Sequence, residues 1–135
     1  MAKALSLRNS LLLALLLCLF LVSCSAPRDL AIAQEATRQL MYSDGAVFYD
    51  RATSVLKAKM TREEFLAMRK RAAAMPGSCG PVHLGRSLFV SNNRGDFVAV
   101  TSRRACNGGD LEESFGWQIV HGMALLDKYE ARKLL

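Results

Sequence analysis

The spacing of the apolar residues changes once along the chain, near Gly80. Before this point they recur every three to four positions, as in amphipathic helices. After it they alternate with polar residues, as in strands that bury one face. A block of helices followed by a block of strands is typical of an α+β domain with helices packed on one face of an antiparallel sheet. We therefore predict three helices followed by a four-stranded antiparallel meander.

Turn and cap signals divide the helical half into three predicted helices. Residues 28–42 place one apolar stripe on a single face, and a short helix over residues 46–53 follows. Thr61 and Glu64 have the spacing of a capping box, which predicts the start of the third helix. Pro76-Gly77 predicts its end.

Residues of alternating polarity predict the four strands. They cover residues 82–90, residues 96–104, a segment containing residues 115–119, and residues 123–132. The side chains of Val82, Leu84, Leu88 and Val90 are expected on one face of the first strand. Turns are expected at residues 92–95, 107–110 and 121–122.

Two cysteines flank the first predicted hairpin. A turn centred on Asn92-Asn93 places Cys79 opposite Cys106, where a cross-strand bridge can close. A redox pair normally has the spacing Cys-x-x-Cys, and the two histidines of the chain do not complete a zinc-ligand pattern. We therefore predict a structural disulfide rather than a redox or metal site.

The N-terminal segment has the features of an export signal. Lys3 and Arg8 precede an apolar run over residues 11–22, which is too short to cross about 30 Å of hydrocarbon at 1.5 Å per residue. Ser23 and Cys24 follow directly. The alternatives are an ordinary secretory signal that is cut elsewhere and a helix belonging to the folded domain.

The sequence Leu21-Val22-Ser23-Cys24 resembles the lipobox of bacterial lipoproteins. The resemblance implies that residues 1–23 are a signal peptide, that cleavage falls between Ser23 and Cys24, and that Cys24 carries acyl chains. Residues 24–28 would then form a short lipidated tether. Ser25 in place of Asp implies delivery to the outer membrane, facing the periplasm. An oxidising compartment of this kind also favours the predicted disulfide.

The order of the predicted elements over residues 29–133 is similar to the nuclear transport factor 2-like superfamily, or cystatin-like α/β cone. It is more narrowly similar to an uncharacterised family of short bacterial exported proteins. The residues that carry the resemblance are Asp44-Gly45, Phe48, Tyr49, Thr61-Arg62-Glu63-Glu64-Phe65, Trp117 and Tyr129. The chain departs from the family pattern in its last hairpin, because its tryptophan precedes the turn and Gly122 is followed by Met123.

The cone fold implies a concave sheet face that can hold a ligand. We expect Phe115, Trp117, Tyr129 and Tyr49 to line it and to receive a small apolar ligand or a side chain of an envelope protein. Plain core packing is the alternative interpretation of these aromatic residues.

Some proteins of this fold are isomerase-like or dehydratase-like enzymes, which use an Asp or His base and a Tyr donor. The residue types that could serve here are Tyr42, Asp44, Tyr49, Asp50, His83 and His121. They form no nucleophile triad or carboxylate pair that the sequence identifies. We therefore expect a non-catalytic binding domain without cofactor or metal. A cone-pocket enzyme and a structural or assembly lipoprotein are the alternatives.

The chain has a net charge of +6. Basic residues gather around the third predicted helix and in the second strand, namely Lys57, Lys59, Arg62, Arg69, Lys70, Arg71, Arg103 and Arg104. We expect these side chains to be solvated and not to bind nucleic acid, because aromatic residues are not interleaved with them. The membrane, reached through the acyl chains, is the expected partner.

Overall fold

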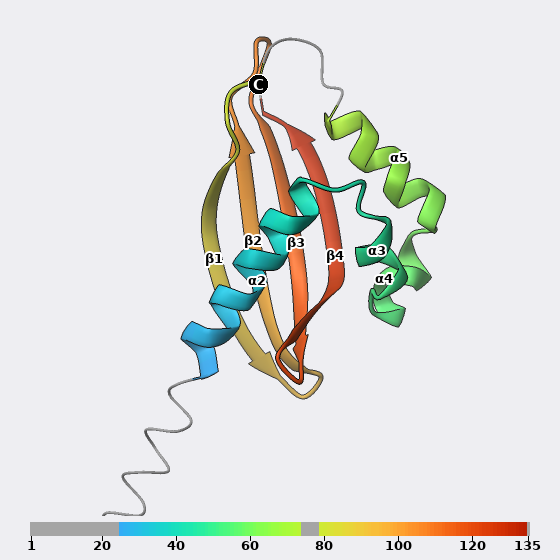
Figure 1. The fold of residues 1–135 in the computed structure, drawn as a ribbon, viewed down its shortest axis with the longest axis vertical. Coiled ribbons are helices and arrows are strands. Elements are labelled where there is room, and N and C mark those ends of the chain that lie inside the picture. Colours follow the sequence, from blue (N-terminus) through green and yellow to red (C-terminus); the bar gives the residue numbers. More distant parts are fainter. Residues whose placement is uncertain (1–24, 74–78, 135) are drawn as a thin grey trace, which may run out of the picture.

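The computed structural model describes residues 25–73 and 79–134. In these residues four helices precede a four-stranded antiparallel sheet, as Figure 1 shows. The helices are α2 (Ser25–Met41), α3 (Ala46–Asp50), α4 (Ser54–Lys59) and α5 (Arg62–Ala73). The strands are β1 (His83–Asn92), β2 (Gly95–Arg104), β3 (Leu111–Val120) and β4 (Met123–Lys133), paired in the order of the chain. The predicted α+β class and the antiparallel meander are confirmed.

The prediction of three helices is wrong, because the segment expected as one helix over residues 46–53 is followed by a separate helix. Thr53 has an extended backbone, and its hydroxyl oxygen accepts a hydrogen bond from the Leu56 amide at 3.3 Å. It therefore caps a new helix, α4, instead of continuing α3. The Thr53 amide donates to the Leu126 carbonyl at 3.0 Å, which ties this junction to β4.

The capping box at the start of α5 is confirmed. The Glu64 amide donates to the Thr61 hydroxyl at 3.2 Å, and the Thr61 amide donates to the Glu64 carboxylate at 2.7 Å. Both donors would otherwise have no partner within the helix. The predicted stop at Pro76-Gly77 lies outside the described residues.

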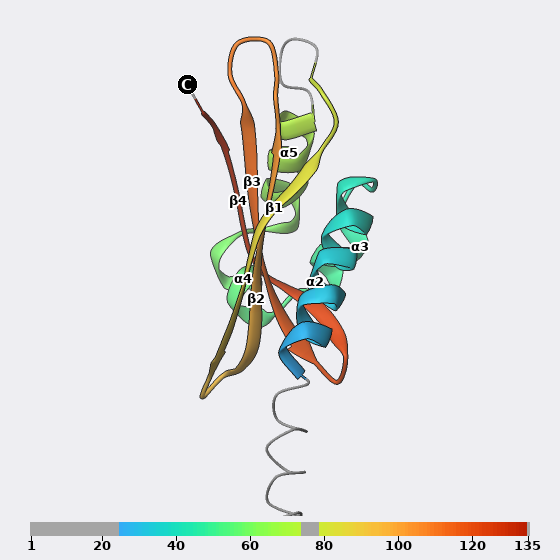
Figure 2. The ribbon, with the colours of Figure 1, turned by 90° about the vertical axis from the view of Figure 1, so that its left-hand side faces the viewer.

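The helices are arranged around one face and one edge of the sheet. Helix α2 lies across one face and contacts all four strands, whereas α3 and α4 pack against β4 (Figures 1 and 2). The opposite face carries exposed side chains, including Leu88 and Val90 at 57% and 44% exposure. Of residues 24–28, expected as a tether, residues 25–28 belong to α2, and Cys24 lies outside the described residues.

The predicted disulfide between Cys79 and Cys106 is confirmed, although the hairpin register behind the prediction is wrong. Asn92 pairs with Gly95, so the turn is centred one residue later than expected. The pairing then shifts between Leu84 and Ser87, and shifts again before Cys79 pairs with Cys106 in an isolated bridge. Because of these two shifts, Cys79 lies opposite Cys106 although the turn is not at the predicted position.

The irregularity in β1 also changes which side chains face the helices. It spans Gly85 and Arg86, and a Cβ atom on Gly85 would approach the Thr101 hydroxyl oxygen to 2.8 Å. Leu84 packs against the core on one side of the irregularity, but Leu88 and Val90 beyond it point to the exposed face. The prediction that these residues share one face is therefore wrong, because a bulge reverses the alternation.

The turn between β3 and β4 is a two-residue hairpin turn, as predicted. Val120 pairs with Met123, and the intervening His121 and Gly122 have φ of 49° and 74°. Positive φ at both central residues is the pattern of a type I′ turn.

Candidate functional site

The four aromatic residues expected to line a pocket lie in the core. Trp117, Phe115, Tyr129 and Tyr49 are 0%, 1%, 3% and 7% exposed. The Phe115 and Tyr129 rings have centroids 5.4 Å apart, and Phe65 links the Tyr129 ring to Tyr49 through contacts of 5.2 and 5.7 Å. The structure therefore brings these side chains together as packing that fills the helix-covered side of the sheet.

The polar atoms of this aromatic cluster are used inside the protein. Trp117 Nε1 donates to the Thr37 hydroxyl at 2.9 Å, and that hydroxyl donates to the Ala33 carbonyl at 2.8 Å. The Tyr49 hydroxyl donates to the Met60 carbonyl at 2.6 Å. These bonds join α2 to β3 and α3 to the end of α4, so they serve the fold.

A buried ionic network lies next to the aromatic cluster, and sequence reasoning missed it. Glu113 on β3 is 1% exposed. Its Oε1 atom accepts hydrogen bonds from Arg69 Nη1 and, at 2.6 Å, from the Tyr129 hydroxyl. The expectation that Arg69 is solvated is wrong, because this residue is 6% exposed on the inner side of α5. Arg69 Nη2 also donates to the Leu40 carbonyl at 3.3 Å.

The network keeps the Tyr129 phenol protonated. Burial, followed by the charge of Glu113, raises the pKa of the Tyr129 phenol well above its ordinary value of 10.0, so Tyr129 remains a neutral donor. The Glu113 carboxylate is enclosed and has an arginine as its partner. A general base needs access to a substrate proton, so this arrangement favours a structural role in joining α5, β3 and β4.

A pattern in the sequence does mark these positions. Glu113 alternates with Leu111 and Phe115 and therefore shares their buried face. Arg69 follows Phe65 by four residues and so lies on the same side of α5.

The other candidate acid–base residues are spread over the molecule. Asp44 accepts from the Ala46 amide at 3.0 Å, which is the bonding of a turn. Asp50, at the end of α3, pairs with Arg62 at 2.9 Å, and the hydrogen bond from Arg62 lowers the pKa of the Asp50 carboxyl. His83 is exposed at the start of β1 and His121 at the β3–β4 turn, and Tyr42 is exposed at the end of α2.

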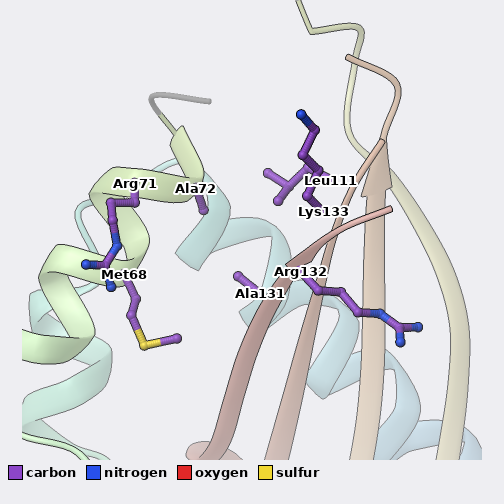
Figure 3. A pocket seen from close by; sticks show the side chains of 7 residues that line it. All are labelled: Met68, Arg71, Ala72, Leu111, Ala131, Arg132 and Lys133. Carbon is purple, nitrogen blue, oxygen red and sulfur yellow. The ribbon is translucent and has the colours of Figure 1, made fainter. Parts of the chain in front are cut away.

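A surface pocket of about 170 Å³ lies between α5 and the end of β4 (Figure 3). An apolar floor is formed by Met68, Ala72, Leu111 and Ala131. Figure 3 shows that the cationic groups of Arg71, Arg132 and Lys133 point in different directions. Arg132 is also bound to Glu112 at 2.6 Å. These cations do not converge on a point where an anion could bind.

A larger groove of about 510 Å³ runs between α2, α3 and β4. Most of its lining is apolar, and its residues are Ala31, Ile32, Glu35, Ala36, Gln39, Phe48, Arg51, Met123, Ala124 and Leu125. Glu35 and Arg51 are exposed. The groove has the apolar lining and sparse polar groups of a small-molecule site.

Within residues 25–73 and 79–134 there is no cluster of three or more His, Cys, Asp or Glu side chains that could hold a metal ion. No helix in the same part of the chain is long and apolar enough to cross a membrane. The predicted cleavage and acylation residues, Ser23 and Cys24, lie outside the described residues.

Comparison of the chain with protein-family models, curated proteins and solved structures finds no match. The lipoprotein and nuclear transport factor 2-like resemblances therefore stay predictions made from the residues.

Proposed function

We propose that this chain is a bacterial envelope lipoprotein that is anchored through Cys24, faces the periplasm and acts as a non-catalytic interaction module. The observation that supports an interaction module is the filled interior of the domain. The aromatic residues on the helix-covered face are buried against one another, and the Tyr129 hydroxyl is bound to Glu113. A partner would therefore meet the surface of the domain. This role corresponds to a structural or assembly lipoprotein.

The disulfide supports the proposed compartment. Cys79 and Cys106 are bonded, and disulfides persist in oxidising compartments such as the periplasm. The lipobox residues support the anchor, since Cys24 follows Ser23 at the end of a short apolar run.

Metabolic labelling with a fatty-acid analogue tests the anchor. The wild-type chain should incorporate the label and sediment with membranes, whereas Cys24→Ala should lose both properties. Cys18→Ala is the matched control, because Cys18 lies inside the segment expected to be removed. Unchanged labelling and membrane retention of Cys24→Ala would refute the proposal.

A second candidate function is binding of a small apolar ligand, and the groove between α2, α3 and β4 favours it. This location differs from the aromatic cluster expected from the sequence. Native mass spectrometry of protein extracted in mild detergent should then show an added mass. Phe48→Glu, which places a charge in the groove lining, should remove that mass. An added mass that persists unchanged in Phe48→Glu would exclude a ligand in the groove.

A further inference from the structure

The start of α2 fixes which end of the domain lies nearest to the anchor. Helix α2 begins at Ser25, directly after the lipobox cysteine. If Cys24 carries the acyl chains, as proposed above, no flexible linker separates the lipid from the first turn of α2. The N-terminal end of α2 must then lie at the membrane surface.

The β3–β4 turn lies at the same end of the molecule. A Cβ atom on Gly122 would lie 3.1 Å from Arg28 Nη2, so the turn and the first helical turn are neighbours. Figures 1 and 2 show the β1–β2 turn at this end as well, and the C-terminus and the β2–β3 turn at the opposite end. We call the residues Arg28, Arg94, His121 and Met123 the anchor-side end.

The anchor-side end combines an exposed apolar side chain with cations. Met123 is 59% exposed at the first position of β4. Arg28 is exposed, and the Arg94 side chain remains 51% exposed although it pairs with Asp127. An apolar side chain enters the region between headgroups and acyl chains, and arginines attract anionic headgroups. This composition fits a lipid surface.

We propose that the anchor-side end rests on the membrane, with Met123 in the interfacial region and Arg28 and Arg94 at the headgroups. This inference rests on the proposed acylation of Cys24. The orientation leaves the far end, with the β2–β3 turn and the disulfide, directed away from the lipid. The surface available to an envelope partner would therefore be the far end and the exposed sheet face.

Site-specific fluorescence tests the orientation. The full lipoprotein is purified from membranes and reconstituted into vesicles of phosphatidylethanolamine and phosphatidylglycerol that contain spin-labelled lipid. A polarity-sensitive fluorophore is attached through Met123→Cys. The matched control is Ala73→Cys, since Ala73 is an exposed residue that ends α5 towards the far end. Cys79 and Cys106 are bonded to each other, so the introduced thiol is the one that reacts.

The fluorophore at residue 123 should shift to shorter wavelength and lose most of its emission to the spin-labelled lipid, whereas the fluorophore at residue 73 should do neither. Arg28→Gln should weaken quenching at residue 123 in anionic vesicles, and Arg71→Gln on α5 should not. Protein that floats with vesicles but shows no quenching at residue 123 overturns this inference alone. Protein that does not float overturns the acylation proposal and this inference with it.

Discussion

Substitution of Glu113 by Gln tests the buried ionic network directly. The side chain keeps its shape, so the core remains filled, but the carboxylate charge is removed. Arg69 then remains a buried cation without its counter-charge, although it retains its hydrogen bond to the Leu40 carbonyl. Its Nε atom already lacks a partner among the described residues.

The expected loss in the free energy of unfolding is about 3 kcal/mol, because breaking a buried ion pair by removing one partner costs roughly 3–5 kcal/mol. The lower end applies because the amide oxygen of Gln still accepts a hydrogen bond. A domain of this size has roughly 5–15 kcal/mol of stability in total. At about 4 °C per kcal/mol, the midpoint of thermal unfolding should fall by at least about 12 °C.

Glu112→Gln is the matched control, since it makes the same change at the preceding position of β3. Glu112 pairs with Arg132, whose side chain is 69% exposed, and a pair of this kind contributes about 0–1 kcal/mol. Urea unfolding of the oxidised domain from Ser25 onward, followed by circular dichroism, gives both values. Combining Arg69→Met with Glu113→Gln should recover most of the loss, because no buried charge then remains. Equal small effects of the two glutamine variants would refute the reasoning.

Three further predictions concern pH, helix capping and the disulfide. The pKa of Tyr129 is raised in the folded state, so stability should fall as pH rises above about 10, by up to about 1.4 kcal/mol per pH unit. Unfolding measured from pH 9 to 11 should show this loss in the wild type and not in Tyr129→Phe. Thr61→Ala should cost about 1 kcal/mol in urea unfolding through loss of the cap, and exposed Glu63→Ala less than about 0.5 kcal/mol. Replacing Cys79 and Cys106 together by Ala should cost about 3.5 kcal/mol for a sequence separation of 27. Two free thiols on alkylation of wild-type protein kept under oxidising conditions would contradict the bond itself.

Local signals in the sequence were sufficient for several elements. Thr61 and Glu64 identify the start of α5 because both bonds of the capping box form between residues three apart. The two-residue turn at His121-Gly122 is predictable for a similar reason, because Gly122 tolerates positive φ. Such features depend on chemistry within one turn of chain, and tertiary packing reinforces them.

Features that depend on distant residues were not predictable in the same way. The residues around Gly85 do not indicate that Thr101 on the next strand leaves no room for a Cβ atom there. The bulge that reverses the faces of β1 is therefore not predictable from the local sequence. The pairing of Arg69 with Glu113 joins residues 44 apart, and a charged residue on a helix is normally solvated. The expectation that aromatic residues line a pocket also depends on distant residues. Alternation identifies Phe115 and Trp117 as inward-facing, but it does not indicate whether other side chains fill the space in front of them.

The helices precede every strand in the described chain, yet hydrogen bonds tie them to the last two strands. Thr37 is hydrogen-bonded to Trp117, 80 residues later, and Thr53 joins Leu126 on β4. Contacts this distant in sequence make folding slow, since the chain must close long loops before they form. The core cannot be completed until the final strand is available. Late completion of the core is compatible with the export proposed above, which requires a chain that has not yet folded.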